Sequence, residues 1–226
     1  MKANEKDFME GRIEKLLKRM NYEQGKKVLV FLDTGAIIDA EEELAKYKLY
    51  NSGAQIEKIY NSLLGRGLNL FVISPVFGEV LSHHNCNKVN GRAEISKQNF
   101  EIVSNLQSAY ENFLQNIKNN DKDEIDAVRR DVYWASVFAF EEDKKKGERD
   151  PISHVDRELI SSAAWARYAH VPFYSKNANG GIETVVQKPD EVIVLSPDSH
   201  VEKTITMMSI NQLGLNYEGI RTVSSR

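Results

Sequence analysis

Three carboxylates occupy positions where a parallel α/β sheet gathers its functional side chains. Asp33 directly follows the apolar run Val28–Leu32, which predicts a buried strand. Glu79 lies early in the helix expected after a second apolar run, Leu68–Ile73, and Asp156 lies in the first turn of a later helix. Loops at the carboxyl ends of parallel strands converge on one edge of the sheet, so we expect the three side chains to lie close together.

Carboxylates that are brought together repel one another, and their burial is costly unless a cation accompanies them. Their oxygen atoms are hard ligands of the kind that Mg²⁺ and Mn²⁺ prefer, and these ions commonly bind a substrate phosphate as well. Such a site permits hydrolysis of a phosphodiester, because the metal activates water and stabilises charge on the leaving oxygen. We therefore expect a hydrolase dependent on Mg²⁺ or Mn²⁺, with Asp33, Glu79 and Asp156 as its catalytic and metal-binding residues.

The elements that must position these residues follow one another as strand, helix, strand, helices and strand. An amphipathic helix is expected within residues 1–26, and residues 27–226 are expected to form one domain with a helical insertion at about residues 88–150. Three more short strands are expected after the insertion, at Val171–Tyr174, Ile182–Val186 and Val192–Leu195. This order predicts an α/β fold, a three-layer sandwich around a central and mainly parallel sheet.

Three segments resemble the motifs of the PIN-domain family of metal-dependent ribonucleases. Val30–Gly35 is similar to the opening strand of that family, whose first metal ligand is an aspartate followed by a small or hydroxyl residue. Ser74–Val80 resembles the second motif, a glutamate–valine pair early in a helix. Asp156–Ala164 resembles the third, an aspartate that leads a helix of small residues. The resemblance spans the chain from Lys27 to Leu195 and also implies a PIN-like fold.

This resemblance implies an endoribonuclease that hydrolyses RNA phosphodiester bonds with Mg²⁺ or Mn²⁺. Asp33 and Asp156 would bind the metal directly or through water, and Glu79 would be a ligand or would orient the attacking water. Proteins of this kind commonly form homodimers, and many are the toxins of toxin–antitoxin systems. The expected partners are therefore RNA, a second copy of the chain and an antitoxin-like inhibitory protein.

The fourth metal-site position of the PIN pattern is a Ser or Thr followed, after one residue, by Asp or Asn. Two segments fit it: Ser175–Asn177 follows the third predicted strand, and Ser196–Asp198 follows the fifth. The first is the preferred interpretation, with Asn177 as a metal ligand through its carbonyl oxygen. Thr34 and Ser175 are then expected to contact the substrate.

Each carboxylate also has an ordinary structural interpretation. Asp33 is able to cap the helix that follows it, and Glu79 fits a solvated helix face. Ser153 and Asp156 have the spacing of a capping box. The asparagine at the fourth position favours an alternative, a catalytically degenerate PIN-like module that binds nucleic acid or protein. A metal-dependent phosphatase with a small substrate is a third hypothesis.

Two further groups of residues have more than one interpretation. His83, His84 and Cys86 are of zinc-ligand types, but adjacent histidines cannot both face one side of a helix, so a helix surface is the preferred interpretation. Four aromatic residues crowd one part of the insertion, and packing in the core or at a dimer contact is favoured over base stacking. They are Tyr133, Trp134, Phe138 and Phe140.

Composition limits the partners and the compartment. The net charge is −3, so contact with nucleic acid must come from local basic groups or from a bound metal ion. The single cysteine, Cys86, excludes an intramolecular disulfide and suits a reducing compartment. No apolar run is long enough to cross a bilayer, and residues 1–20 have no signal-peptide pattern. A cytoplasmic protein without membrane contact is expected.

Overall fold

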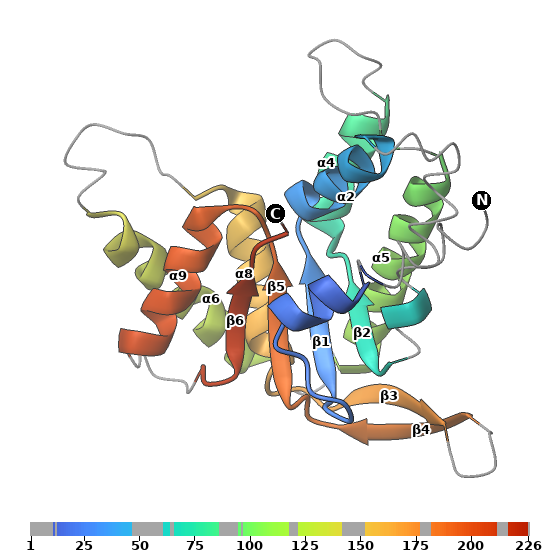
Figure 1. The fold of residues 1–226 in the computed structure, drawn as a ribbon. Helices are drawn as coiled ribbons and strands as arrows, with labels where there is room; N and C mark the ends of the chain where they lie inside the picture. The colour runs from blue at the N-terminus through green and yellow to red at the C-terminus, as the bar shows by residue number, and fades with distance from the viewer. Residues whose placement is uncertain are drawn as a thin grey trace, which may run out of the picture.

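A computed structural model gives the three-dimensional structure of the chain (Figure 1). It describes residues 11, 13–46, 61–63, 66–85, 95, 97–117, 122–141, 152–176, 182–211 and 217–225. The elements in chain order are β1 (Val28–Leu32), α2 (Thr34–Lys46), β2 (Leu68–Phe71), α4 (Ser74–Asn85), α5 (Lys97–Ile117), α6 (Lys122–Ala139), α8 (His154–Ala166), β3 (Val171–Lys176), β4 (Ile182–Gln187), β5 (Glu191–Leu195), α9 (Ser199–Asn211) and β6 (Ile220–Val223).

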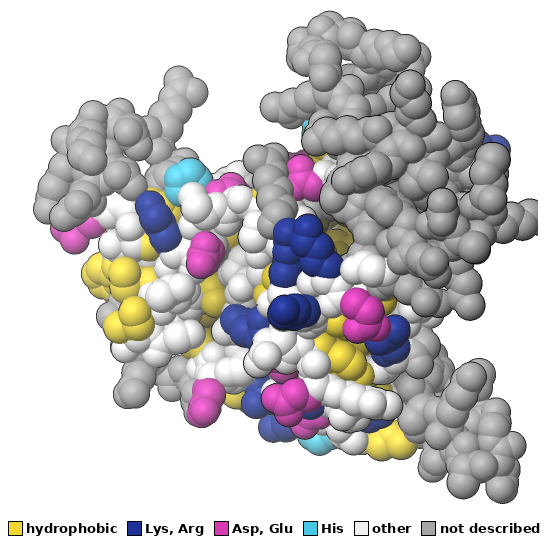
Figure 2. Space-filling model, in the orientation of Figure 1, with side chains coloured by type: hydrophobic (Ala, Val, Ile, Leu, Met, Phe, Trp, Pro, Cys, Tyr) yellow, Lys and Arg dark blue, Asp and Glu magenta, His cyan; other side chains and the backbone are white. Residues whose placement is uncertain are grey.

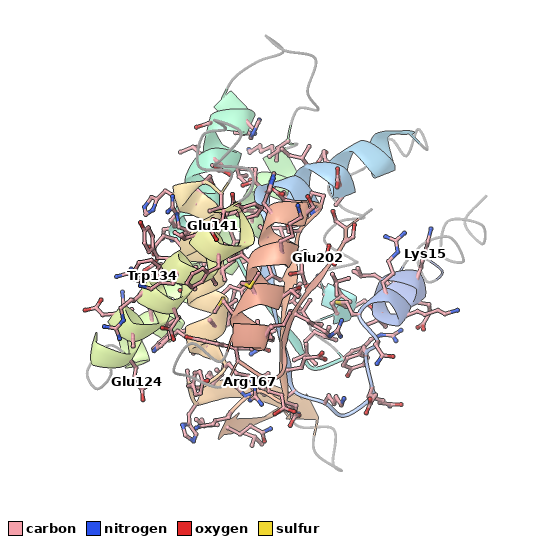
Figure 3. The ribbon with its side chains drawn as sticks, turned by 90° about the vertical axis from the view of Figure 1, so that its left-hand side faces the viewer. Lys15, Glu124, Trp134, Glu141, Arg167 and Glu202 are labelled. Carbon is pink, nitrogen blue, oxygen red and sulfur yellow. The ribbon has the colours of Figure 1, made fainter. Side chains whose placement is uncertain are left out.

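The central sheet has four strands in the order β2-β1-β5-β6, and all of its neighbouring pairs are parallel. Every residue of β1 is buried, as expected for an inner strand with helices on both sides. The N-terminal helix lies over one face of the sheet, whereas α5 and α8 lie over the other (Figures 1 and 3). The predicted α/β class with a central parallel sheet between helices is therefore confirmed.

Strands β3 and β4 form a separate antiparallel hairpin. The Asn69 side chain, near the start of β2, donates a hydrogen bond to the Pro172 carbonyl of β3 over 2.9 Å. The hairpin thus lies below the amino-terminal ends of β1 and β2, as Figure 1 shows. The preferred fourth position, Ser175–Asn177, required β3 to end at the same edge of the sheet as Asp33. In the structure β3 instead pairs with β4 at the opposite end of the sheet; Asn177 itself lies outside the described residues, so its role as a metal ligand stays a prediction.

Segments on both sides of the sheet share one hydrophobic core. Helical turns over residues 13–19 place Ile13 and Leu17 in the same buried cluster as β1, so the N-terminal helix packs onto the domain. The predicted insertion joins this core as well, because Phe113 of α5 stacks on Phe71 of β2 with 5.3 Å between ring centroids. Offset stacking of this kind adds about 0.5–1.5 kcal/mol to the burial of the rings. The helices of the insertion therefore build one layer of the domain.

One strand of the structure has no clear signal in the sequence. Strand β6 is at the edge of the sheet, and only its first and last residues are buried. Because an edge strand is only partly buried, its sequence, Ile-Arg-Thr-Val, does not have the continuous apolar run that marks an inner strand. Helix α9 covers β6 and packs on α6. Among the residues that the structure describes, no helix has the length and apolar character of a membrane span.

Candidate active site

Asp33 lies at the centre of the candidate site, between the end of β1 and the start of α2. Its backbone amide donates to the Leu195 carbonyl of β5 over 3.1 Å, and its carbonyl accepts the first helical hydrogen bond of α2, from the Ile37 amide, over 3.2 Å. The Thr34 amide, at the first position of α2, donates a hydrogen bond to the Asp33 carboxylate. The side chain is only 6% exposed, which means that its charge has little contact with water.

Glu79 reaches this region from α4, the helix after β2. Its Oε2 accepts a hydrogen bond of 2.6 Å from the Thr34 hydroxyl. Thr34 is itself buried beside Asp33, so one short connection joins the helices that follow β1 and β2. Thr34 was expected to contact the substrate, but its hydroxyl proton is directed at Glu79. In the structure, Thr34 positions a carboxylate.

Asp156 approaches from the first turn of α8. Its Oδ2 accepts the Ser153 amide over 3.0 Å, while its own amide donates to the Ser153 hydroxyl over 3.0 Å. The pair therefore forms the capping box that the spacing indicated. Its role in capping α8 is compatible with metal binding, because the hydrogen bonds between described residues engage only one of the two oxygens of the Asp156 carboxylate.

A fourth segment, Ser196–Asp198, arrives from β5, the strand directly beside β1. The Ser196 hydroxyl donates to Asp33 Oδ2 over 2.6 Å and accepts the Asp198 amide over 3.0 Å. Ser196 is 2% exposed, so its buried hydroxyl holds the Asp33 carboxylate and the Asp198 amide in fixed positions. Asp198 caps α9 through a 2.7 Å hydrogen bond from the His200 amide to its Oδ1, and His200 Nδ1 lies 3.0 Å from the same oxygen. Of the two candidates for the fourth position, the structure brings Ser196–Asp198 to Asp33.

The other candidate, Ser175–Asn177, is described only as far as Lys176, the last residue of β3. Ser175 pairs in backbone register with Glu183 of the hairpin, at the opposite end of the sheet. Asn177 lies outside the described residues. Ser196 lies beside Asp33 because β5 is adjacent to β1. The sequence does not show that the fifth predicted strand lies next to the first. The Ser-x-Asp pattern at Ser196 was the available signal.

The site carries concentrated negative charge. The pKa of Asp33 is raised to about 6. Burial is the largest cause, the charges of Asp156 and Glu79 also raise the pKa, and hydrogen bonds from Ser196 and the Thr34 amide oppose them. The two charge effects place three carboxylates from separate parts of the chain within electrostatic reach of one another. Among the ion pairs between described residues, none involves Asp33, Glu79 or Asp156.

Donors of this kind fit a hard divalent cation, because all are oxygen atoms and their charge is not neutralised by a described lysine or arginine. Within the described part of the chain, however, no three Asp, Glu, His or Cys side chains lie close enough to hold an ion jointly. Mg²⁺ commonly keeps several of its water ligands and uses only one or two carboxylates. The arrangement therefore suits an ion held partly through water.

The histidines of the possible zinc site have other contacts. His84 stacks on Phe100 of α5, with 4.6 Å between ring centroids, and its Nδ1 is 2.8 Å from the Ile95 carbonyl. Cys86 lies outside the described residues. These contacts agree with the preferred interpretation, in which this end of α4 is a packed helix surface.

Gly35 allows the Ser196–Asp198 segment to approach α2, which gives a first prediction. A Cβ atom at position 35 would lie 2.6 Å from Pro197 Cγ and 2.9 Å from Pro197 Cδ. Gly35→Ala is expected to lower the free energy of unfolding by about 1–3 kcal/mol in urea denaturation, because the rigid proline ring must move. Gly78→Ala is the matched control, since a Cβ there meets no atom within 4 Å, and it is expected to stabilise α4 slightly. Equal stability of Gly35→Ala and wild type would show that Pro197 is not held against α2.

Comparison with protein-family models, with curated proteins and with solved structures finds no match to this chain.

Proposed function

We propose that this chain is a PIN-like endoribonuclease that hydrolyses RNA phosphodiester bonds with Mg²⁺ or Mn²⁺. The observation that supports this most directly is the grouping of Asp33, Glu79 and Asp156 at the carboxyl end of the parallel sheet, where the charges of the other two raise the pKa of Asp33. Their order along the chain and their surrounding residues also resemble the three PIN motifs. The preference for RNA rests on that resemblance.

Each residue has a distinct part in the proposed site. Asp33, with Asp156, would hold the cation directly or through water, and Glu79 would be a further ligand or would orient the attacking water. Ser196 would keep the Asp33 carboxylate in one orientation, and Thr34 would do the same for Glu79. When bound, the ion would supply Lewis-acid polarisation of the phosphate and a lowered pKa of water. The protein would contribute fixed carboxylates and a negatively charged edge in which Asp33 is buried.

RNA must be attracted to this edge by positive charge elsewhere, because the net charge of the chain is −3. Lys15, Lys18 and Arg19 are exposed on the N-terminal helix, opposite to its buried Ile13 and Leu17. Figure 2 shows Lys and Arg side chains gathered near the middle of the face on which Figure 1 draws this helix. The Arg19 guanidinium donates to the Ser225 carbonyl, and the Ser225 hydroxyl donates to Asp39, so Arg19 is connected to α2, the helix that follows Asp33.

The test is incubation of the pure protein with a mixed RNA pool and Mn²⁺, with and without a chelator, beside a panel of small phosphate esters. RNA cleavage that the chelator abolishes supports the nuclease. Hydrolysis of the small esters alone would indicate a phosphatase instead.

A second candidate function is a PIN-like binding module without catalysis. It is favoured by the capping role of Asp156 and by the absence, among described residues, of three side chains already placed around one ion. Calorimetric titration with Mn²⁺ distinguishes the two. No heat of binding together with no cleavage supports the module, whose partner would then be an antitoxin-like protein or a nucleic acid.

Ser196 gives a further prediction about the proposed site. Its hydroxyl hydrogen bond lowers the pKa of Asp33, so Ser196→Ala is expected to raise that pKa further. The acid limb of the pH–rate profile for cleavage should move to higher pH, and the rate near pH 7 should fall by about 10- to 100-fold, as for other residues that orient metal ligands. Ser196→Thr keeps the hydroxyl and should restore the wild-type profile. Unchanged acid limbs in both variants would remove Ser196 from the proposed site.

A further inference from the structure

The first turn of α9 lies at the same edge of the sheet as Asp33. Strand β5 ends at Leu195 and α9 begins at Ser199, so the helix starts at the end of the sheet where the candidate site is (Figure 1). Ser196 connects the two directly, because its hydroxyl donates to Asp33 and accepts the Asp198 amide. The start of α9 is therefore held in a fixed position relative to the proposed metal site.

His200 is held on two sides in this turn, although 39% of its side chain is exposed. Its Nδ1 lies 3.0 Å from Asp198 Oδ1, and its ring packs edge-on against Phe140, with 5.1 Å between ring centroids. Phe140 is completely buried, unlike three other aromatic residues of this part of the chain, which are each 47% exposed: Tyr133, Trp134 and Phe138. The contacts with Asp198 and Phe140 fix the direction of the His200 ring, at the cost of its rotamer freedom.

The contact with Asp198 determines which nitrogen of the His200 ring is offered to a ligand. A carboxylate oxygen only accepts hydrogen bonds, so it favours a proton on Nδ1. In the neutral imidazole the other ring nitrogen, Nε2, then has a lone pair and accepts a hydrogen bond. No hydrogen bond between described residues engages Nε2. This nitrogen is therefore available to a hydroxyl donor from outside the chain.

Lys203 adds a positive charge one helical turn further along α9. Its Nζ lies 5.6 Å from the centre of the Phe140 ring, so Lys203 and His200 contact the same buried ring. Lys203 is exposed, and it forms no ion pair with a described residue. Its neighbour Glu202 is also exposed, so this surface is not strongly basic. The turn is therefore suited to contact with a single phosphate rather than to general attraction of nucleic acid.

A hydroxyl donor and a phosphate occur side by side in RNA, where each ribose carries a 2′-hydroxyl next to its 3′-phosphodiester. DNA has the phosphate but not the hydroxyl. We propose that His200 and Lys203 bind one nucleotide of the RNA strand beside the scissile bond, with His200 Nε2 accepting from the ribose 2′-hydroxyl and Lys203 pairing with the phosphate. This inference rests on the proposed function, and it gives the preference for RNA a physical basis in this chain. An acceptor placed for a hydroxyl discriminates against a strand that lacks it.

Binding of RNA and DNA without cleavage tests the two contacts separately. The measurement is fluorescence anisotropy, in the presence of a chelator, of a labelled single-stranded RNA and of a DNA of the same sequence that contains deoxyuridine in place of thymidine. The wild type should bind the RNA about 3- to 10-fold more tightly, as expected for one hydrogen bond at a partly exposed site. His200→Ala should make the two dissociation constants equal. Loss of a purely structural role of His200 would instead weaken binding of both strands and leave their ratio unchanged.

Lys203→Gln should weaken binding of both strands by the same factor. It should also reduce the slope of log affinity against log salt concentration by about 0.7, the value for one phosphate contact on a single strand. Lys203→Arg keeps the charge and should restore the wild-type affinity and slope. Lys188→Gln is the matched control, because Lys188 is an exposed lysine just before β5, at the opposite end of the sheet, and should change neither. Circular dichroism spectra that match the wild type would show that the variants are folded.

Equal affinity of the wild type for RNA and DNA, an RNA preference that His200→Ala retains, or an unchanged salt slope in Lys203→Gln would each overturn the proposal. If the same protein still cleaves RNA with Mn²⁺, the proposed nuclease stands and only the contacts of His200 and Lys203 are wrong. A wild type that neither binds nor cleaves RNA would remove both the proposed function and this inference.

Discussion

Asp33→Asn is expected to reduce Mn²⁺-dependent RNA cleavage by at least about 100-fold, the loss typical of removing one preorganised charged or polar group from an active site. The reason is electrostatic. Asparagine keeps the size of the side chain and an oxygen acceptor for the Thr34 amide, but it removes the charge that a divalent cation would bind. The measurement is the initial rate of cleavage of the same RNA pool by wild-type and variant protein at saturating Mn²⁺.

Two controls make this result specific. Glu79→Gln and Asp156→Asn should also lose activity, whereas Glu101→Gln should not, because Glu101 is a 63% exposed carboxylate on α5 that pairs with Lys97. Mn²⁺ should raise the unfolding temperature of the wild type, since a ligand that binds only the native state stabilises it by mass action. Asp33→Asn should lose that stabilisation. Retention of both cleavage and metal stabilisation in the variant would place the active site elsewhere.

The same substitution is expected to make the protein more stable near neutral pH. The pKa of Asp33 is raised to about 6 from the ordinary aspartate value of 3.8, chiefly by burial. The native state therefore binds more protons than the unfolded state between these two values. The free energy of unfolding should fall as pH rises through that window, by about 3 kcal/mol from this group alone. The side chain of the Asp33→Asn variant does not ionise, so the variant does not lose this free energy of unfolding as pH rises.

The measurement is urea unfolding in the presence of a chelator, at pH values from about 4.5 to about 7.5. The difference in stability between Asp33→Asn and wild type should grow in favour of the variant as pH rises. Glu101→Gln serves again as the matched loss of one carboxylate and should run parallel to the wild type. Parallel curves for Asp33→Asn as well would contradict a buried carboxylate with a raised pKa.

Taken together, the two results would separate function from folding at one residue. An Asp33→Asn protein that is more stable and yet inactive cannot owe its inactivity to unfolding. A gain in stability together with a loss of activity is common where the charged groups of a site repel one another until their ligand binds. Mn²⁺ should have the converse effect on the wild type and weaken the dependence of its stability on pH, because a cation favours the ionised form of Asp33.

The α/β class, the buried strands and three of the carboxylates of the candidate site can be predicted from local sequence. Val28–Leu32 reads as an inner strand because all five of its residues are apolar, and the structure buries all five. Asp33 follows it directly, so its place at the strand end depends only on local order. The capping box of Ser153 and Asp156 was also visible from spacing alone, since both partners belong to the same helix turn.

Which strands are neighbours is settled by the three-dimensional structure alone, and it brings the alternative fourth position, Ser196–Asp198, beside Asp33. The Ser-x-Asn and Ser-x-Asp segments are equally plausible along the chain, and sequence proximity to Asp156 favoured the former. Hydrogen bonding places β5 beside β1 and leaves β3 in a hairpin at the other end of the sheet. Strand pairing depends on contacts between residues that are far apart in the sequence, such as the 2.6 Å hydrogen bond from Ser196 to Asp33. The local periodicity of the sequence does not show such contacts.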